Sequence, residues 1–353
     1  MSANNLSPIR KKLLRWYDNH KRDLPWRRSR DPYAIWLAET MLQQTQVKTV
    51  LPYYEKFLAA FPTAGALARA PLERVLRLWS GLGYYRRAEN LHKAARQLTG
   101  DHRGKMPRDY EQLRALAGIG DYTAGAILSI AFEKPYPAVD GNVRRVLGRL
   151  FSVTGEKELR ALALKLVPKA RPGDFNQALM ELGATVCTPK NQRCAACPVK
   201  LECAGRERDR NVAVDMPRRI KFENVIWPLA IVRRGERILL RRRAAKGLLA
   251  GLWELPGGEL TPRQKISDLL RAQLAGLPVS RAGTKKIGEF PHAITHRRIR
   301  APIYLFELPV SAALGLTRSR WRWVDPTRIE DHAVSSMTSK AVKILAGHEA
   351  TSL

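Results

Sequence analysis

The chain has 353 residues, which at ~150 residues per domain is enough for about two domains with sizeable cores. It carries 62 Lys and Arg against 32 Asp and Glu, a formal net charge of +30, so a polyanion such as nucleic acid is the first candidate partner and a generally basic enzyme is the alternative. Apolar residues make up 45% of the chain, which excludes wholesale disorder, and no apolar run approaches the ~18 residues that cross a bilayer.

The spacing of apolar residues predicts two domains of different class. From Ser7 to Leu201 apolar residues recur at three- and four-residue intervals between Pro and Gly breaks, which indicates a mostly α domain over 1–203. Residues 204–222 are polar and aperiodic, as in a linker. An α+β domain is expected over 223–353. Its predicted strands are 225–232, 237–243, 286–290, 298–308 and 321–324, and its predicted helices are 262–275 and 339–346.

The first candidate site lies on the segment WLAETMLQQTQV, residues 36–47. Glu39 interrupts an otherwise apolar helical pattern, where an unpaired carboxylate is costly to bury. Burial raises a carboxyl pKa and makes a usable general acid near neutral pH, although an isolated Glu is more often a surface residue. Gln44 and Thr45, with their neighbour Gln43, form an uncharged polar cluster suited to base edges.

Two further segments have the pattern of a phosphate-binding hairpin followed by a carboxylate. In LAGIGDYTAGAILS, residues 116–129, Gly118 and Gly120 separate two apolar helices, which favours a helix-hairpin-helix whose backbone amides bind a phosphate. A tight turn without function is the alternative. About twenty residues later comes VDGNVRRVLGR, where Asp140 precedes a helix and is either a functional carboxylate or a simple N-cap.

All four cysteines of the chain fall in one short segment, which excludes a disulfide framework distributed over the fold. Four thiolates in one compact loop favour a [4Fe-4S] cluster, with zinc as the alternative. The default role is structural, holding a loop whose basic residues face phosphates. The proposed ligands are Cys187, Cys194, Cys197 and Cys203.

Taken in order, these motifs resemble the endonuclease III, or helix-hairpin-helix, superfamily of DNA glycosylases. Within it the chain is similar to the adenine DNA glycosylases of the MutY type over nearly its full length. The motifs that carry the resemblance are residues 36–47, GLGYYRRAENLHKAA at 81–95, the hairpin at 118–120, VDGN at 139–142 and the four-cysteine loop. The resemblance implies an iron-sulfur monomer that flips adenine mispaired with 8-oxoguanine out of duplex DNA and hydrolyses its N-glycosidic bond.

The resemblance also implies roles for individual residues. Glu39 would protonate adenine N7 and help to activate water, and Asp140 would be the ionised carboxylate that stabilises an oxocarbenium-like sugar. Tyr122 stands where bifunctional members have a Lys, so no Schiff base can form, and hydrolysis without strand cleavage is expected. Tyr122 and Asn142 would orient the reacting groups.

Further positions match the adenine pocket and the DNA-contacting loops of the family. Trp26, Arg27 and Gln177 are implied as adenine-pocket residues. Gln44 and Tyr84 match wedge positions, and Thr45 and Leu82 match positions near 8-oxoguanine. For Trp26 and Leu82 a place in the core is the alternative.

The second domain resembles the Nudix-related domain of adenine glycosylases through GLLAGLWELPGGE, residues 247–259. The magnesium-binding carboxylates of a Nudix hydrolase are missing from the segment that follows, so recognition without hydrolysis is expected. The family's Phe-Ser-His loop corresponds here to Ile294, Thr295 and His296, with Ile in place of the aromatic residue. Without the family, His296 would be an ordinary surface or core histidine.

Two other functions stay open from the sequence. One is a glycosylase of the same fold that removes thymine or a damaged pyrimidine, against which the second domain argues. The other is a non-catalytic, redox-responsive DNA-binding protein, against which the retention of Glu39 and Asp140 argues. The first segment of the chain has no continuous hydrophobic run and no small-residue cleavage site, so a cytoplasmic, nucleoid-associated protein is expected.

Overall fold

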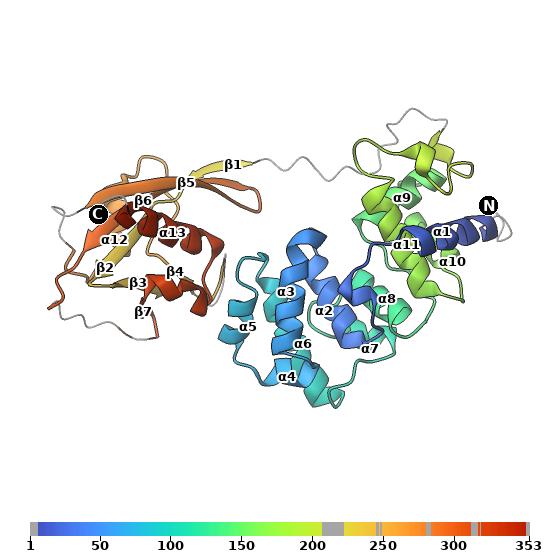
Figure 1. The fold of residues 1–353 in the computed structure, drawn as a ribbon, viewed down its shortest axis with the longest axis horizontal. Helices are drawn as coiled ribbons and strands as arrows, with labels where there is room; N and C mark the ends of the chain where they lie inside the picture. The colour runs from blue at the N-terminus through green and yellow to red at the C-terminus, as the bar shows by residue number, and fades with distance from the viewer. Residues whose placement is uncertain are drawn as a thin grey trace. The chain divides into compact units, whose positions relative to one another are not determined.

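The structure is a computed structural model that describes residues 6–206, 222–244, 247, 249–279, 284–311, 317 and 319–350. The chain divides into two compact units, Met1–Ala70 with Arg86–Arg218 and Pro71–Tyr85 with Arg219–Leu353 (Figure 1). The segment Pro71–Tyr85, expected within the first domain, therefore groups with the second unit. Most of the predicted linker, 207–221, lies outside the described residues.

The described part of the first unit is helical, as the apolar spacing predicted (Figure 1). Its helices before the hairpin are α1 (Ser7–His20), η2 (Pro25–Arg27), α2 (Pro32–Leu42), α3 (Val47–Ala60), α4 (Ala64–Arg69), α6 (Arg86–Asp101) and α7 (Tyr110–Arg114). Those that follow are α8 (Asp121–Ile130), α9 (Gly141–Phe151), α10 (Glu156–Leu166), α11 (Pro172–Thr185), η3 (Cys194–Ala196) and η4 (Ala204–Arg206).

Helix α2 is the central helix of this unit and the one that carries Glu39. Asp31 caps it by accepting a hydrogen bond from the Tyr33 backbone amide, and Pro32 occupies its first position. Every residue from Tyr33 to Met41 is buried, so the helix is apolar on all sides and packs against α3, α6 and α8. A polar side chain on α2 is therefore held in a fixed, water-poor environment.

The hairpin between α7 and α8 has the geometry that its glycines require. Gly118 has φ +76°, and a Cβ there would lie 2.7 Å from the Cβ of Asn90, so both conformation and space demand glycine. Gly120 is the N-cap residue of α8. Farther along α8, Gly125 faces the backbone of the segment that leads to α9, and an added Cβ would lie 2.0 Å from the Pro137 carbonyl oxygen.

A Gly125→Ala substitution is expected to destabilise the first unit by about 1–3 kcal/mol or more, because backbone rather than a flexible side chain must move away from the new methyl group. The matched control is Gly100→Ala on α6, where a Cβ meets nothing within 4 Å and the change should stabilise by ~0.5–1 kcal/mol. Thermal unfolding of both variants checks the prediction. Equal melting temperatures would contradict the close packing of α8 against residue 137.

The second unit is built on a seven-stranded sheet with strand order β1-β6-β2-β3-β4, where β5 pairs with β6 and β7 pairs with β3. The strands are β1 (Glu223–Ile226), β2 (Leu229–Arg234), β3 (Arg237–Arg242), β4 (Trp253–Glu254), β5 (Lys285–Ile294), β6 (Arg297–Glu307) and β7 (Trp321–Val324). The helices are α5 (Leu72–Leu78), α12 (Ile266–Gln273), η6 (Pro326–Asp331) and α13 (Ser336–Ala350). The mixed α+β architecture agrees with the sequence prediction (Figure 1).

Two strands of this sheet differ in their boundaries from the predicted ones. The run expected at 225–232 is two strands, β1 and β2, which pair in parallel with successive parts of β6 and are separated by Trp227 and Pro228. Proline has no amide hydrogen to donate to the ladder, so the strand is interrupted there. Strand β5 continues four residues beyond the expected end at 290 and forms an antiparallel hairpin with β6.

The segment Pro71–Tyr85 joins the second unit through polar contacts. Glu73 on α5 accepts a hydrogen bond from the Trp253 indole nitrogen at 3.0 Å, although the tryptophan is otherwise buried in the sheet core. The Tyr85 hydroxyl donates to the Val334 carbonyl oxygen at 3.2 Å. These bonds satisfy polar atoms that would otherwise be costly to bury.

Candidate active site

The first unit contains a large cleft of about 1940 Å³, bordered by η2, α2, the hairpin, α8, the start of α9, and α11. A concave surface that is lined mainly by apolar side chains, with a few polar groups that point into it, is typical of a ligand-binding site. It brings together most of the residues singled out from the sequence. They are Trp26, Arg27, Glu39, Gln44, Thr45, Gly118, Gly120, Tyr122, Asp140, Asn142 and Gln177.

Glu39 projects from α2 into this cleft and is only 5% exposed. Its carboxylate Oε2 accepts a short hydrogen bond from the Tyr122 hydroxyl. The pKa of Glu39 is raised to about 7 as the net result of four effects: burial, the largest, and the nearby Asp140 carboxyl raise it, whereas the Tyr122 hydrogen bond and the Arg27 charge lower it. Glu39 is thus a buried carboxyl group with a pKa near neutrality, which is the condition that the sequence analysis set for a general acid; its role as the acid stays a prediction.

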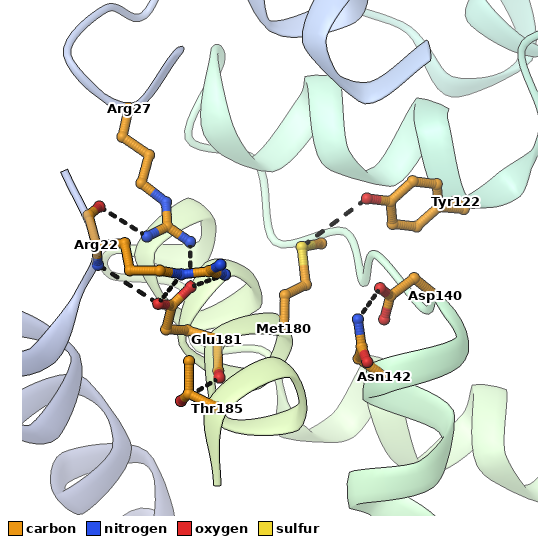
Figure 2. Close-up of polar contacts among 8 residues, drawn as sticks. All are labelled: Arg22, Arg27, Tyr122, Asp140, Asn142, Met180, Glu181 and Thr185. Atoms are coloured by element: carbon orange, nitrogen blue, oxygen red, sulfur yellow. Dashed lines mark hydrogen bonds and ion pairs between the residues drawn. The ribbon is translucent and has the colours of Figure 1, made fainter. Parts of the chain in front are cut away.

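Asp140 makes the cap contact that the sequence suggested and also lines the cleft, so its role as a functional carboxylate stays a prediction. It is the N-cap of α9, because its Oδ1 accepts a hydrogen bond from the Val143 amide at 2.7 Å, and it also lines the cleft. Its Oδ2 accepts from the Asn142 side-chain amide at 3.0 Å (Figure 2). Burial raises the pKa of Asp140, and the Val143 and Asn142 hydrogen bonds oppose that rise. The amide oxygen of Asn142 accepts from Arg145 at 2.8 Å, which fixes the amide in place.

Helix α11 forms one wall of the cleft through Gln177, Met180 and Glu181. Residues three and four apart lie on one face of a helix, so these side chains point in one direction. The Met180 sulfur lies 3.9 Å from the Tyr122 hydroxyl (Figure 2). Burial raises the pKa of Tyr122 well above its ordinary value, with Glu39 and Asp140 adding to the effect, so the phenol stays protonated and donates.

Arg22 and Glu181 line the cleft but were missed by the sequence analysis. The Glu181 side chain has no exposed surface and pairs with Arg22 and Arg27 (Figure 2). A usable signal existed, because Glu181 stands in the apolar helix segment ALMELGA just as Glu39 stands in WLAETML. The same argument about a costly buried carboxylate would have selected it.

The loop after α2 is held by a single buried arginine. Arg87 on α6 is 8% exposed, and its guanidinium donates to the carbonyl oxygens of Thr40, Met41 and Gln43 and to the Thr45 hydroxyl. These carbonyls belong to the end of α2, where the helix leaves its last acceptors unpaired. The hydrogen bonds of Arg87 therefore fix the loop that carries Gln44 and Thr45.

The two residues implied as wedges share an unusual backbone. Gln44 has φ +56° and Tyr84 has φ +49°, a left-handed conformation that costs energy for residues with a side chain. Such strain is concentrated at functional sites. Tyr84 is 44% exposed, whereas Leu82 is 5% exposed, so Leu82 has the burial of a core residue, the alternative kept open for it. Trp26 is 6% exposed and packs edge-to-face on Tyr54.

In the second unit, Thr295 and His296 form the turn between β5 and β6. Thr295 has φ +54°, and its hydroxyl lies 3.3 Å from His296 Nδ1. The His296 side chain is 46% exposed and its Nε2 lies 3.5 Å from a Glu223 carboxylate oxygen. Both side chains are thus presented at the end of a hairpin, and neither is a core residue.

The four cysteines form no disulfide in the structure, and Cys194 is exposed while the others are partly buried. Cys187, Cys197 and Cys203 pack against the apolar core formed by α1, α9, α10 and α11. Burial raises the pKa of Cys197 to about 11, and charges on the other three cysteines add to the effect. Among the described residues, no group of three or more His, Cys, Asp or Glu side chains is arranged to hold a metal ion.

Basic residues from several helices also line the cleft, and two of them, Arg144 and Arg160, pair with Glu156. The basic residues are Lys48 of α3, Arg144, Arg145 and Arg149 of α9, and Arg160 of α10. Side chains of this type bind the phosphates of a nucleic acid backbone. Within the described ranges, the structure has no helix that is both long and apolar enough to span a membrane.

Comparison with known proteins assigns both units. Residues 37–169 match the HhH-GPD superfamily of base excision DNA repair proteins, and residues 229–343 match the NUDIX domain. The adenine DNA glycosylase of Rattus norvegicus is 36% identical over 98% of this chain and 79% of its own length. That of Buchnera aphidicola subsp. Schizaphis graminum is 30% identical over 94% of this chain and 97% of its own.

Solved structures of DNA glycosylases share the fold of the helical first unit. A thermostable thymine-DNA glycosylase matches with a TM-score of 0.56 and 31% identity over 59% of this chain and 100% of its own. Endonuclease III in a non-covalent DNA complex matches with a TM-score of 0.51 and 23% identity over 58% of this chain and 96% of its own, which shows the fold. The chain is a DNA N-glycosylase and belongs to the MutY-type family of adenine DNA glycosylases.

Proposed function

We propose that the protein removes adenine mispaired with 8-oxoguanine from duplex DNA, as a monomer acting on the DNA of the nucleoid, and that it leaves the DNA strand uncut. One observation carries the proposal: a buried acid with a pKa of about 7, Glu39, and a second carboxylate, Asp140, face one cleft together with a tyrosine instead of a lysine. All of the proposed chemistry lies within one chain, which supports a monomer.

Hydrolysis of the N-glycosidic bond needs a proton on the base and a stabilised cationic sugar. In the proposed mechanism, Glu39 gives its proton to adenine N7 while the bond between the base and C1′ breaks, and the bonding electrons leave with the adenine. Water then adds its oxygen to C1′, and the Glu39 carboxylate takes up the proton that the water loses. A pKa of about 7 suits a group that both gives and takes a proton near neutral pH.

Asp140 supplies negative charge to the oxocarbenium-like sugar. Burial raises its pKa, its hydrogen bonds from Val143 and Asn142 oppose that rise, and these bonds fix its orientation before the substrate arrives. Such preorganised charge is an effective source of transition-state stabilisation. Tyr122 holds the Glu39 carboxyl by donating to Oε2, leaving the other oxygen of the acid for the base.

The absence of an amine at residue 122 supports hydrolysis without strand cleavage, because a lyase reaction needs a nitrogen nucleophile to form a Schiff base.

Gln44 and Tyr84 would occupy the space of the flipped adenine, and their left-handed backbones support that role. Gly118 and Gly120 would offer backbone amides at the start of α8 to a phosphate. The adenine pocket would be formed by three residues that line the cleft, Trp26, Arg27 and Gln177.

Recognition of 8-oxoguanine would fall to Thr295 and His296 in the second unit and to Thr45 and Leu82. The exposed turn at the end of the β5–β6 hairpin supports this, because it offers a hydroxyl and an imidazole to a base edge. Ile294 stands beside them without an aromatic ring to stack on a base. Discrimination between 8-oxoguanine and guanine would therefore depend on hydrogen bonds more than on stacking.

The cysteine loop fits a [4Fe-4S] cluster by its donor chemistry, since it gathers four thiols that form no disulfide, and three of them rest on the apolar core. Bound through Cys187, Cys194, Cys197 and Cys203, the group would hold the loop that follows α11 and supply no chemistry to the excision. The purified protein is expected to contain about four iron atoms per chain and to absorb broadly in the visible range. One zinc per chain without visible absorbance would support the zinc alternative.

A single-turnover assay tests the function on a duplex with one adenine opposite 8-oxoguanine. Products are scored with and without hot alkali, beside an adenine opposite thymine and a thymine opposite guanine. Strand breaks that appear only after alkali, and only with adenine opposite 8-oxoguanine, are expected. Cleavage of the thymine substrate would favour the same-fold alternative, and tight binding without an alkali-labile site would favour a non-catalytic protein.

A further inference from the structure

The loop that joins α5 to α6 presents a tyrosine on a strained backbone. Gly83 and Tyr84 both have positive φ, of +78° and +49°. A residue with a side chain adopts such an angle only where the surrounding structure imposes it. The Tyr84 side chain is 44% exposed, so burial of its ring offsets only part of that cost. The groups that hold this loop therefore determine where the Tyr84 ring is presented.

The hydroxyl of the next residue, Tyr85, closes this loop. Tyr85 is 7% exposed, and its hydroxyl accepts a hydrogen bond from the Gly81 backbone amide at 3.2 Å. The Trp79 indole nitrogen donates to the Gly83 carbonyl oxygen at 3.0 Å, which fixes the loop at a second point. A tyrosine hydroxyl donates one hydrogen bond and accepts another, so Tyr85 is able to bind the loop and a further partner at the same time.

That further partner is the Val334 carbonyl oxygen, to which the Tyr85 hydroxyl donates at 3.2 Å. The Ser80 hydroxyl donates to the same oxygen at 2.6 Å, and a carbonyl oxygen has two lone pairs to accept both bonds. Val334 forms a β-bridge with Trp253 of β4, so it is part of the sheet framework of the second unit. The two residues that flank the loop, Ser80 and Tyr85, are therefore anchored to one point of that framework.

Helix α5, which leads into the loop, is held to the second unit as well. Glu73 accepts a hydrogen bond from the Arg322 guanidinium at 2.8 Å. The Arg77 guanidinium donates to the Asp331 carbonyl oxygen at 3.3 Å. The helix and the loop thus move together with the second unit, in agreement with the grouping of Pro71–Tyr85 in that unit.

We infer that Tyr85 is a positioning residue for base flipping, whose hydroxyl ties the loop that presents Tyr84 to the second unit. The inference rests on the proposed function, in which Tyr84 takes the space of the flipped adenine and the Thr295–His296 turn contacts 8-oxoguanine. Tyr85 itself touches no base in this role. The second unit then holds both the turn that recognises the lesion and a residue that displaces the adenine opposite it.

The test is a Tyr85→Phe substitution, which keeps the ring and removes the hydroxyl. Single-turnover excision of adenine opposite 8-oxoguanine is expected to slow by about three- to tenfold, the effect of losing a hydrogen bond of ordinary strength. A second duplex keeps this pair but has mismatched pairs on both sides of it, so that flipping costs less unstacking. On the second duplex the variant is expected to approach the wild-type rate. Equal slowing on the two duplexes, or no slowing on either, would overturn the inference.

A double-mutant cycle tests whether the effect passes through the Tyr84 ring. Tyr84→Ala is expected to slow excision from the fully paired duplex by about tenfold or more, the usual effect of losing one stacked aromatic ring. Because Tyr85 acts by placing Tyr84, Tyr85→Phe should cause little further loss in the Tyr84→Ala background. Independent sites would instead multiply their effects, and that result would overturn the inference.

The matched control is Tyr33→Phe in the first unit. The Tyr33 hydroxyl is also buried and donates to a backbone carbonyl oxygen, that of Phe61 at 2.8 Å, and Tyr33 does not line the cleft. Both phenylalanine variants should lose a comparable amount of melting temperature, but Tyr33→Phe should excise adenine at the wild-type rate on both duplexes. If it showed the same duplex-dependent loss, any buried hydroxyl would have the effect and the inference would fail.

A second variant covers the case in which Tyr85→Phe does not fold. Ser80→Ala removes the other donor to the Val334 carbonyl oxygen and leaves the Tyr85 hydroxyl in place. Its loss is expected to be confined to the fully paired duplex, and an equal loss on both duplexes would overturn the inference. If the wild type excises no adenine, the proposed function fails, whereas adenine excision without any duplex-dependent loss in these variants sinks the inference alone.

Discussion

A Glu39→Gln substitution is expected to lower adenine excision by about 10²- to 10⁴-fold, because the buried acid that is proposed to protonate the base is lost. The structure predicts that the variant folds. Gln is close in shape to Glu, its amide oxygen can accept the Tyr122 hydroxyl hydrogen bond, and the cost of a buried carboxylate disappears. DNA affinity should stay close to that of the wild type, since phosphate contacts dominate binding.

Single-turnover excision and fluorescence anisotropy on the same duplex check both halves of this prediction. The control is Glu55→Gln on α3, an exposed carboxylate outside the cleft, which should retain full activity. Full excision by the Glu39 variant would show that another group donates the proton. Loss of binding together with activity would instead indicate that Glu39 shapes the cleft without acting as the acid.

The apolar surroundings of Glu39 could be recognised from the sequence because they are local. Helix α2 is apolar through its own residues, so a carboxylate at Glu39 had to be buried wherever the helix packed. The spacing of Gly118 and Gly120 likewise predicted the hairpin from neighbouring residues alone. Features of this kind, which depend on a few adjacent residues, can be predicted from the sequence alone.

The partners of those residues could not be predicted in the same way, because they come from distant segments. Glu181 meets Arg22 and Arg27 across more than 150 residues of chain, and Arg87 reaches the end of α2 from α6. Periodicity says which face of a helix is buried but not which helix it meets. The grouping of Pro71–Tyr85 with the second unit has the same origin, since its contacts to Trp253 and Val334 leave no mark on local composition.

The sequence also left Asp140 undecided between a cap and a functional carboxylate, and the structure gives it both kinds of contact. An Asp140→Asn substitution is expected to separate them. Asn is as good an N-cap as Asp, so the bond to the Val143 amide can be kept. The negative charge is lost, and adenine excision should fall by about 10²- to 10³-fold, the usual effect of removing a preorganised electrostatic group.

The stability of two variants at this position decides between the roles. Asp140→Ala loses the cap as well and should destabilise the protein by about 0.5–2 kcal/mol, whereas Asp140→Asn loses only the hydrogen bond from Asn142 and should unfold closer to the wild type. Excision should be equally poor in both, because both lack the charge. If activity followed stability instead, with Asp140→Asn active and Asp140→Ala inactive, Asp140 would be a cap alone. The cationic sugar would then need another source of negative charge, and if the ionised form of Glu39 supplied it, Glu39 could not also be the acid in the same step.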